Sequence, residues 1–130
     1  MTNKTLIDAV RYRDLTLVEK LIQQEIDLEQ RDHRGSTPLR IAAGSDQFVI
    51  AEKLIEAGAD PFTMDSLYIT AAGGVENSLL TPDSPDGAAR LRLLEVFKEK
   101  GVTFPVPSPQ EMPQALKDGR WPKHATPPLL

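Results

Sequence analysis

Residues 32–43 read DHRGSTPLRIAA, and this stretch decides the fold. Its first half, up to Gly35, is rich in turn-forming residues, and the glycine can adopt the left-handed backbone that a tight turn needs. Its second half starts a helix, with Thr37 as the N-cap and Pro38 at the first helical position, where a missing N–H costs little. Ala42 and Ala43 then present small side chains, which let a neighbouring helix pack closely. The stretch predicts a turn that leads directly into a packed helix.

Outward from this stretch, the pattern recurs at an interval of 33 residues. The interval separates three pairs of identical residues: Ala9 and Ala42, Asp27 and Asp60, and Asp32 and Asp65. The apolar positions recur with it, since Leu6, Ala9, Val10, Leu17, Val18, Leu21 and Ile22 precede Leu39, Ala42, Ala43, Ile50, Ala51, Leu54 and Ile55 by the same distance. A constant interval of this size is typical of stacked supersecondary units and predicts a surface built to hold another molecule.

Each complete unit is expected to be a pair of short antiparallel helices. Apolar spacings of three and four predict helices over about 5–13, 14–24 and 47–56, and a further helix that starts at Thr37 and contains Leu39, Ala42 and Ala43. Thr5 with Asp8 resembles a capping box, Asp14 is a candidate N-cap, and Gly58 is placed to end the fourth helix.

The third unit looks irregular in the sequence. Only six positions separate Asp65 from Ala71, whereas ten separate Asp32 from Ala42, which predicts a turn and helix start shortened by four residues. Turn formers then dominate residues 73–88, so we expect an inserted loop there. Two roles for this loop stay open, a partner-contacting element and tolerated surface slack. Helical periodicity returns at Arg90 and continues to Gly101.

The last segment, residues 105–130, is rich in proline, with seven in 26 residues. Ser108-Pro109-Gln110-Glu111 has the pattern of a helix start, and Gly119 would end that short helix. Its apolar residues are expected to fold back over the last repeat, because an uncovered end of the stack would leave an apolar patch in water. The alternative is that they dock on a partner. These residues are Val106, Met112, Leu116 and Trp121.

Composition narrows the classes of function. The chain has 15 Lys and Arg against 19 Asp and Glu, and no cysteine. The absence of cysteine excludes thiolate chemistry and disulfides and fits a reducing compartment. Net acidity disfavours nucleic acid as a partner, because phosphate binding needs a basic footprint. His33 and His124 are not in metal-ligand spacing, and no catalytic or phosphate-binding motif is present. We therefore expect no enzyme activity, no cofactor and no metal.

These residues resemble the ankyrin-repeat family. Residues 32–43 match its signature D-x-x-G-x-T-P-L-H-x-A-A except at Arg40, and Gly58-Ala59-Asp60 match its G-A-D. Arg13 and Asp46 stand where the family has a glycine between the helices, at some cost in backbone strain. The resemblance implies an all-α ankyrin-repeat solenoid of about three helix-turn-helix repeats (about 1–31, 32–64 and 65–104), followed by the proline-rich extension.

The resemblance also implies a function, since ankyrin repeats generally bind proteins through their turn tips and the concave face of their first helices. Transferred position by position, these contacts fall on Arg11, Tyr12, Arg31, His33, Arg34, Ser36, Gly44, Ser45 and Met64, and less firmly on Gly73 and Gly74. Arginine and tyrosine are common anchors of protein interfaces. The hypothesis is that this face grips an acidic patch on another protein.

The expected role is a cytoplasmic, monomeric protein that masks or inhibits one partner, for example an immunity protein that neutralises a co-encoded toxin. A scaffold that joins two proteins is the rival within the binding class. Nucleic-acid binding through the arginines is the rival from another class, and a steep loss of affinity with salt would reveal it. No segment of the sequence has the length and apolarity of a membrane span.

Overall fold

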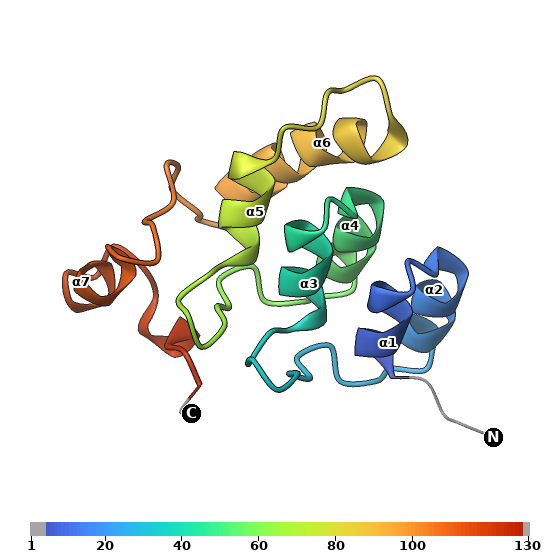
Figure 1. The fold of residues 1–130 in the computed structure, drawn as a ribbon, viewed down its shortest axis with the longest axis horizontal. Coiled ribbons are helices and arrows are strands. Elements are labelled where there is room, and N and C mark those ends of the chain that lie inside the picture. Colours follow the sequence, from blue (N-terminus) through green and yellow to red (C-terminus); the bar gives the residue numbers. More distant parts are fainter. Residues whose placement is uncertain (1–4, 129–130) are drawn as a thin grey trace.

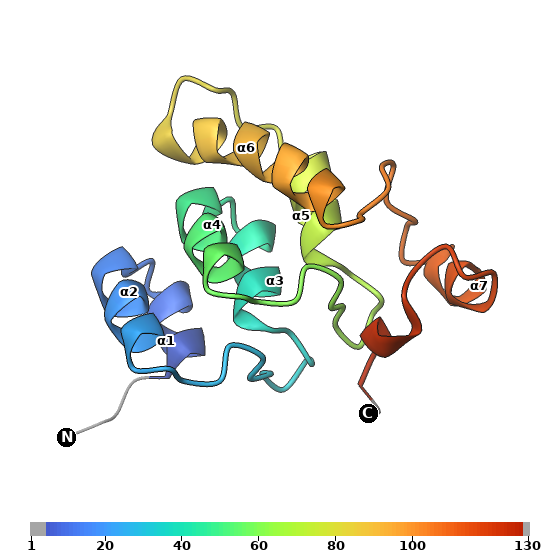
Figure 2. The same cartoon turned by 180° about the vertical axis from the view of Figure 1, so that it is seen from behind.

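The computed structural model describes residues 5–128, and the helices in this range form two layers. Figures 1 and 2 show α1, α3 and α5 on one side of the stack and α2, α4 and α6 on the other. The described α-helices are α1 (Leu6–Arg11), α2 (Leu15–Gln23), α3 (Pro38–Gly44), α4 (Phe48–Glu56), α5 (Ala71–Asn77), α6 (Pro85–Glu99) and α7 (Met112–Lys117). A single 3₁₀ turn, η1 (Lys123–Ala125), lies near the end.

The core lies between these layers. Each inner helix packs on its own outer helix and on the inner helix of the next unit, and the outer helices stack on one another in the same order. Leu39 on α3 is 1% exposed and Leu54 on α4 is fully buried, as expected for the centre of a helix pair. Each unit thus covers the apolar face of its neighbour. The predicted all-α solenoid of stacked helix pairs is confirmed.

The 33-residue interval fixes where the first two units begin and end their outer helices. α2 and α4 both have nine residues and start 33 positions apart. The residues that stand in place of glycine between the helices, Arg13 and Asp46, have positive φ values of 56° and 61°. This is the strain that the sequence predicted at these two positions.

The turn of the third unit is complete, so the predicted shortening by four residues was wrong. Thr70 caps α5 as Thr37 caps α3, 33 positions earlier. The Asp65 carboxylate accepts hydrogen bonds from the backbone N–H groups of Leu67 and Ile69, at 2.9 and 3.0 Å, and so holds a turn of full length.

The error came from the two alanines after Thr70. Ala71 and Ala72 resemble the small pair that ends the signature, yet they occupy the first two helical positions, where the middle unit has Pro38 and Leu39. The turn glycine is also missing, because Tyr68 replaces it with φ of 64°.

The inserted loop is also shorter than the predicted 73–88. Residues 73–77 belong to α5 and 85–88 to α6, which leaves 78–84 as the connection. Ser84 caps α6 through its side chain, and Pro85 follows at the first helical position, the same signal as Thr37-Pro38. α6 has 15 residues where α4 has nine, so much of the additional length is helix.

The extension lies at the end of the stack remote from α1 (Figure 1). Trp121 is buried, its indole N–H donates to the Phe62 carbonyl at 3.0 Å, and the two rings meet edge to face at 5.5 Å. His124 pairs with Asp60 at 2.9 Å. Residues 120–125 therefore contact the chain between α4 and α5, while 105–109 lie beside α5.

Candidate protein-binding surface

Two turns project from the inner layer, at residues 31–37 and 64–70, and we name them the first and second finger turns. Each is organised by one aspartate. In the first, the Asp32 carboxylate accepts hydrogen bonds from the N–H groups of Arg34 and Ser36, both at 2.9 Å, and the Asp32 N–H donates to the Ser36 carbonyl. The second finger turn repeats this arrangement around Asp65.

The pKa of the Asp32 carboxyl lies below its ordinary value. Burial by itself would raise this pKa, but the N–H groups of Ser36 and Arg34 and the charge of Arg11 outweigh it. The carboxylate is therefore held in its charged form at neutral pH, and the turn keeps its shape without a partner.

The two finger turns are joined to each other. The Arg31 guanidinium donates to the Gly35 carbonyl at 2.7 Å and to the Met64 carbonyl at 2.9 Å. Ser66 donates to the Arg34 carbonyl through its N–H at 3.0 Å and its hydroxyl at 2.6 Å. These contacts fix the spacing of the turns and so create one continuous edge.

Two of the predicted contact arginines thus have structural partners. Arg31 links the turns, and Arg11 on α1 forms an ion pair with Asp32 at 2.8 Å across to the next unit, with 46% of its side chain exposed. Arg11 and Arg31 can therefore contact a partner only with the part of each guanidinium group that these bonds leave accessible.

Met64 and Ser36 do not belong to the surface, which corrects the prediction for both. Met64 is 1% exposed and Ser36 is 6% exposed, because each residue lies at the base of its finger turn, where the turn meets the core. Their contribution is structural: the Met64 carbonyl accepts from Arg31, and the Ser36 backbone closes the first turn.

At the other end of the inner helices, the predicted positions are partly accessible. Tyr12 is 69% exposed and Gly44 is exposed, with the Arg40 guanidinium close beside the glycine. The Ser45 hydroxyl donates to the Ile41 carbonyl at 2.7 Å, and the Ser45 carbonyl accepts from Arg13. Ser45 therefore ties α3 to the first unit.

The finger tips offer the freest side chains. His33 and Arg34 are exposed, and within residues 5–128 no hydrogen bond or ion pair engages the Arg34 guanidinium. Leu67 is 62% exposed at the equivalent position of the second turn, 33 residues later. The sequence reading missed Leu67 because it treated this turn as shortened; the unbroken interval would have found it.

Gly73 and Gly74 have different surroundings on α5. A Cβ at Gly74 would lie 2.8 Å from the Ala43 carbonyl oxygen, so this glycine faces α3 and permits close packing of the two helices. At Gly73 the nearest atom would be the Thr70 hydroxyl at 3.2 Å. Gly74 is thus explained by helix packing.

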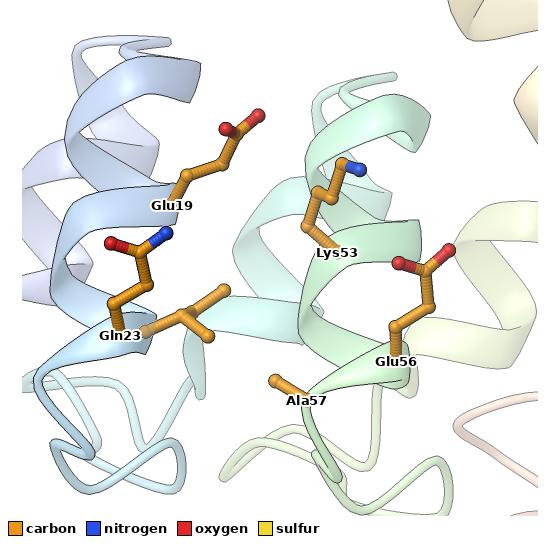
Figure 3. Close-up of a pocket in the computed structure, with 6 residues that line it drawn as sticks. Glu19, Gln23, Lys53, Glu56 and Ala57 are labelled. Carbon is orange, nitrogen blue, oxygen red and sulfur yellow. The ribbon is translucent and has the colours of Figure 1, made fainter.

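The outer layer carries a groove of its own. Its volume is about 320 Å³, and Glu19, Gln23, Lys53, Glu56 and Ala57 are among the residues that line it. Figure 3 shows Glu19 and Gln23 on α2 beside Lys53 and Glu56 on the neighbouring helix α4. The charges that line this groove are of both signs. Between α4 and α6, by contrast, Arg92 and Glu52 close the seam with a two-fold hydrogen bond at 2.8 Å.

The described residues show neither a metal-binding cluster nor a transmembrane segment. Within residues 5–128 no group of three or more His, Cys, Asp or Glu side chains could hold a metal ion. Helix length and apolarity in the same range fall short of what is needed to cross a bilayer.

Comparison with known proteins identifies the repeats. Residues 34–66 match the family model for the ankyrin repeat. The chain is 34% identical over 93 residues to protein phosphatase 1 regulatory subunit 27 of Mus musculus, which covers 72% of this chain and 53% of that protein. It is 34% identical over 65 residues to NF-kappa-B inhibitor delta of Mus musculus, and this match covers 46% of this chain and 20% of that protein. The chain spans about half the length of the first of these relatives and a fifth of the second.

Together with the stacked helix pairs and the paired finger turns, these matches show that the chain belongs to the ankyrin-repeat family.

Proposed function

We propose that this protein binds a single protein partner along its finger turns and regulates that partner by masking part of its surface. The observation that carries the proposal is the edge built by the two finger turns. The turns are held rigid by their aspartates and by Arg31, yet His33, Arg34 and Leu67 at their tips are exposed. A preformed edge loses little conformational entropy on binding.

The chemistry of the tips favours protein over nucleic acid. The core of a protein interface is more apolar than its rim and is enriched in arginine, and the exposed Arg34 and Leu67 occupy equivalent positions of the two finger turns. Nucleic-acid binding would require Arg11 and Arg31 to contact phosphate groups. Both guanidinium groups already donate hydrogen bonds within this chain, Arg11 to Asp32 and Arg31 to two backbone carbonyls. The partner patch is proposed to be acidic opposite Arg34 and apolar opposite Leu67.

Regulation by masking is favoured over scaffolding by the relatives' names. One relative is named as a regulatory subunit and the other as an inhibitor. The described edge has two finger turns, which is little room for two partners. Masking of a co-encoded toxin is one form of this role, and it requires that an equimolar amount of the protein abolish the toxin's activity. We further propose that the protein is cytoplasmic and monomeric and has no enzyme activity. A chain without cysteine loses no disulfide in a reducing compartment.

The test starts with capture of the partner from the source organism and measurement of its affinity by calorimetry. Arg34→Glu and Leu67→Asp should each weaken binding by about tenfold or more, since interface anchors are commonly worth over 1 kcal/mol. Lys20→Glu is the control, because it makes the same charge change on the exposed face of the outer helix α2. Equal affinity of all four proteins would reject the finger edge as the binding surface.

A further inference from the structure

A groove of about 500 Å³ lies where the extension passes the third unit. One wall is the end of the second finger turn and α5, with Tyr68, Thr70, Gly73 and Glu76; the other wall is the proline-rich segment 105–109. The repeats alone would leave this side of α5 open. The groove therefore exists only because this chain continues past its third unit and returns along it.

Tyr68 contributes to the groove from a backbone that does not suit it. Its φ is 64°, at the position where the first finger turn has Gly35 with φ of 78°. A left-handed conformation is unfavourable for a residue with a side chain, and glycine adopts it without that cost. Glycine could make the same turn without strain. The strained Tyr68 backbone instead places a half-buried aromatic ring in the groove wall.

Among the residues that the structure describes, Glu76 is the only charged one that lines the groove. One of its carboxylate oxygens accepts a hydrogen bond from the Val106 N–H at 2.8 Å. This bond links Glu76 to the opposite wall of the groove. Within residues 5–128 no ion pair engages Glu76. The nearby Arg90 donates to the carbonyls of Val75 and Glu76, at 2.6 and 2.8 Å, and thereby holds the helix end.

We propose that this groove receives an extended segment of the protein partner that carries a lysine or arginine, whose cationic head meets Glu76. The carboxylate, half-buried and without an ion-pair partner among residues 5–128, attracts a cation more strongly than a fully solvated one. The aromatic ring of Tyr68 and the prolines suit the aliphatic stem of such a side chain, and the ring face adds attraction for the charge. This inference rests on the proposed function and adds a second contact, of opposite sign to Arg34.

The test uses the full chain and the peptide acetyl-Ala-Arg-Ala-amide as probe, followed by ¹⁵N–¹H NMR. Saturable shifts are expected at Tyr68, Gly73, Glu76 and Val106. The peptide with citrulline in place of arginine keeps the shape but removes the charge, and it should shift these signals at least tenfold less at the same concentration. Equal shifts with both peptides, or no shift at these positions, would overturn the proposal.

Two variants and a control test the roles of the wall residues. Glu76→Gln keeps an acceptor for the Val106 N–H and removes the charge, so the arginine peptide should bind about tenfold more weakly. Tyr68→Gly removes the ring while relieving the backbone, so binding should weaken in a protein that is still folded. Glu99→Gln, on the exposed end of α6, should bind as the unchanged chain does. Unaltered binding by Glu76→Gln would refute the proposal.

The outcome is separable from that of the proposed function. If the groove fails these tests while Arg34→Glu still weakens partner binding, the finger edge stands and the groove has no part in it. If peptide binding at the groove is found but Arg34→Glu and Leu67→Asp leave partner affinity unchanged, the groove stands and the finger edge is rejected.

Discussion

At the scale of single residues, Asp32 bears on both stability and the shape of the binding edge. Its carboxylate, 7% exposed, satisfies two backbone N–H groups of the first finger turn and pairs with Arg11. Because its pKa is lowered in the folded protein, the carboxylate stabilises the fold above its unfolded-state value near 3.8, and this stabilisation is lost as the pH falls through the lower folded value.

We therefore expect Asp32→Asn to lower the free energy of unfolding by about 1–3 kcal/mol at pH 7, as for hydrogen bonds to a charged group. The difference between the two proteins should shrink as the pH falls below 3.8. Urea unfolding at pH values from 7 to 2.5 measures it.

The difference between the two proteins is the quantity to compare, because other carboxyls also titrate in this range. Burial raises the pKa of Glu29 above 4.5, which gives the opposite slope, and this contribution is common to both proteins. A difference that stays constant from pH 7 to 2.5 would contradict the role given to Asp32.

At the scale of elements, the contact between α3 and α5 depends on the absence of one side chain. Gly74 lies against the Ala43 carbonyl, whereas Gly73 meets only the hydroxyl of the capping Thr70. Both glycines are inside a helix, where alanine is intrinsically favoured by roughly 1 kcal/mol.

The two alanine substitutions should thus have opposite effects. Gly74→Ala forces the helices apart and should destabilise the fold by about 1–3 kcal/mol, as overpacking does. Gly73→Ala should leave stability unchanged or raise it by up to about 1 kcal/mol. Thermal unfolding of the pair measures this, and equal stabilities would show that α5 does not pack on α3 through Gly74.

The same element shows why the sequence reading failed in the third unit. Thr70 and Asp65 kept the 33-residue interval, but Tyr68 hid the turn glycine and Ala71-Ala72 imitated the end of the signature. A tyrosine with positive φ cannot be inferred from local propensity, because the surrounding hydrogen bonds impose it. Ser84 and Pro85 carry the same local signal as Thr37-Pro38, but the prediction placed them in the loop and started the helix at Arg90, whereas α6 starts at Pro85.

At the scale of the whole molecule, the extension joins distant parts of the chain. Trp121 is 2% exposed and reaches back to Phe62, while Val106 is held by Glu76. These contacts cover the third unit and form the second wall of the groove.

Removal of residues 105–130 should therefore lower the melting temperature by at least about 5 °C, since the loss of even 1 kcal/mol has roughly that effect in a domain of this size. Trp121→Ala in the full chain should cost about 3–5 kcal/mol, as for other buried large side chains. Circular dichroism follows both. Equal stability of the truncated protein would favour the other role for the extension, docking on a partner.

Trp121→Phe provides the matched control for this experiment. It keeps one aromatic ring near Phe62 and removes the indole N–H together with part of the buried ring volume, so it should cost less than Trp121→Ala. Trp121 is also the only tryptophan of the chain, so its fluorescence reports whether the extension is docked. A solvent-exposed emission spectrum in the folded protein would contradict the packing described above.

The sequence by itself determined the repeat interval, the helix pairs of the first two units and the residues that cap α1, α2 and α3, because these depend on local propensity and on apolar spacing along one helix. It also placed Arg34 and His33 at a turn tip. The tertiary structure decided which of the candidate residues remain available, because burial and hydrogen bonding are properties of neighbouring units. Met64 and Ser36 are buried in the core and so cannot contact a partner. Arg31 donates to the Met64 carbonyl of the second finger turn. The groove at Glu76 forms between residues about 30 positions apart in the sequence.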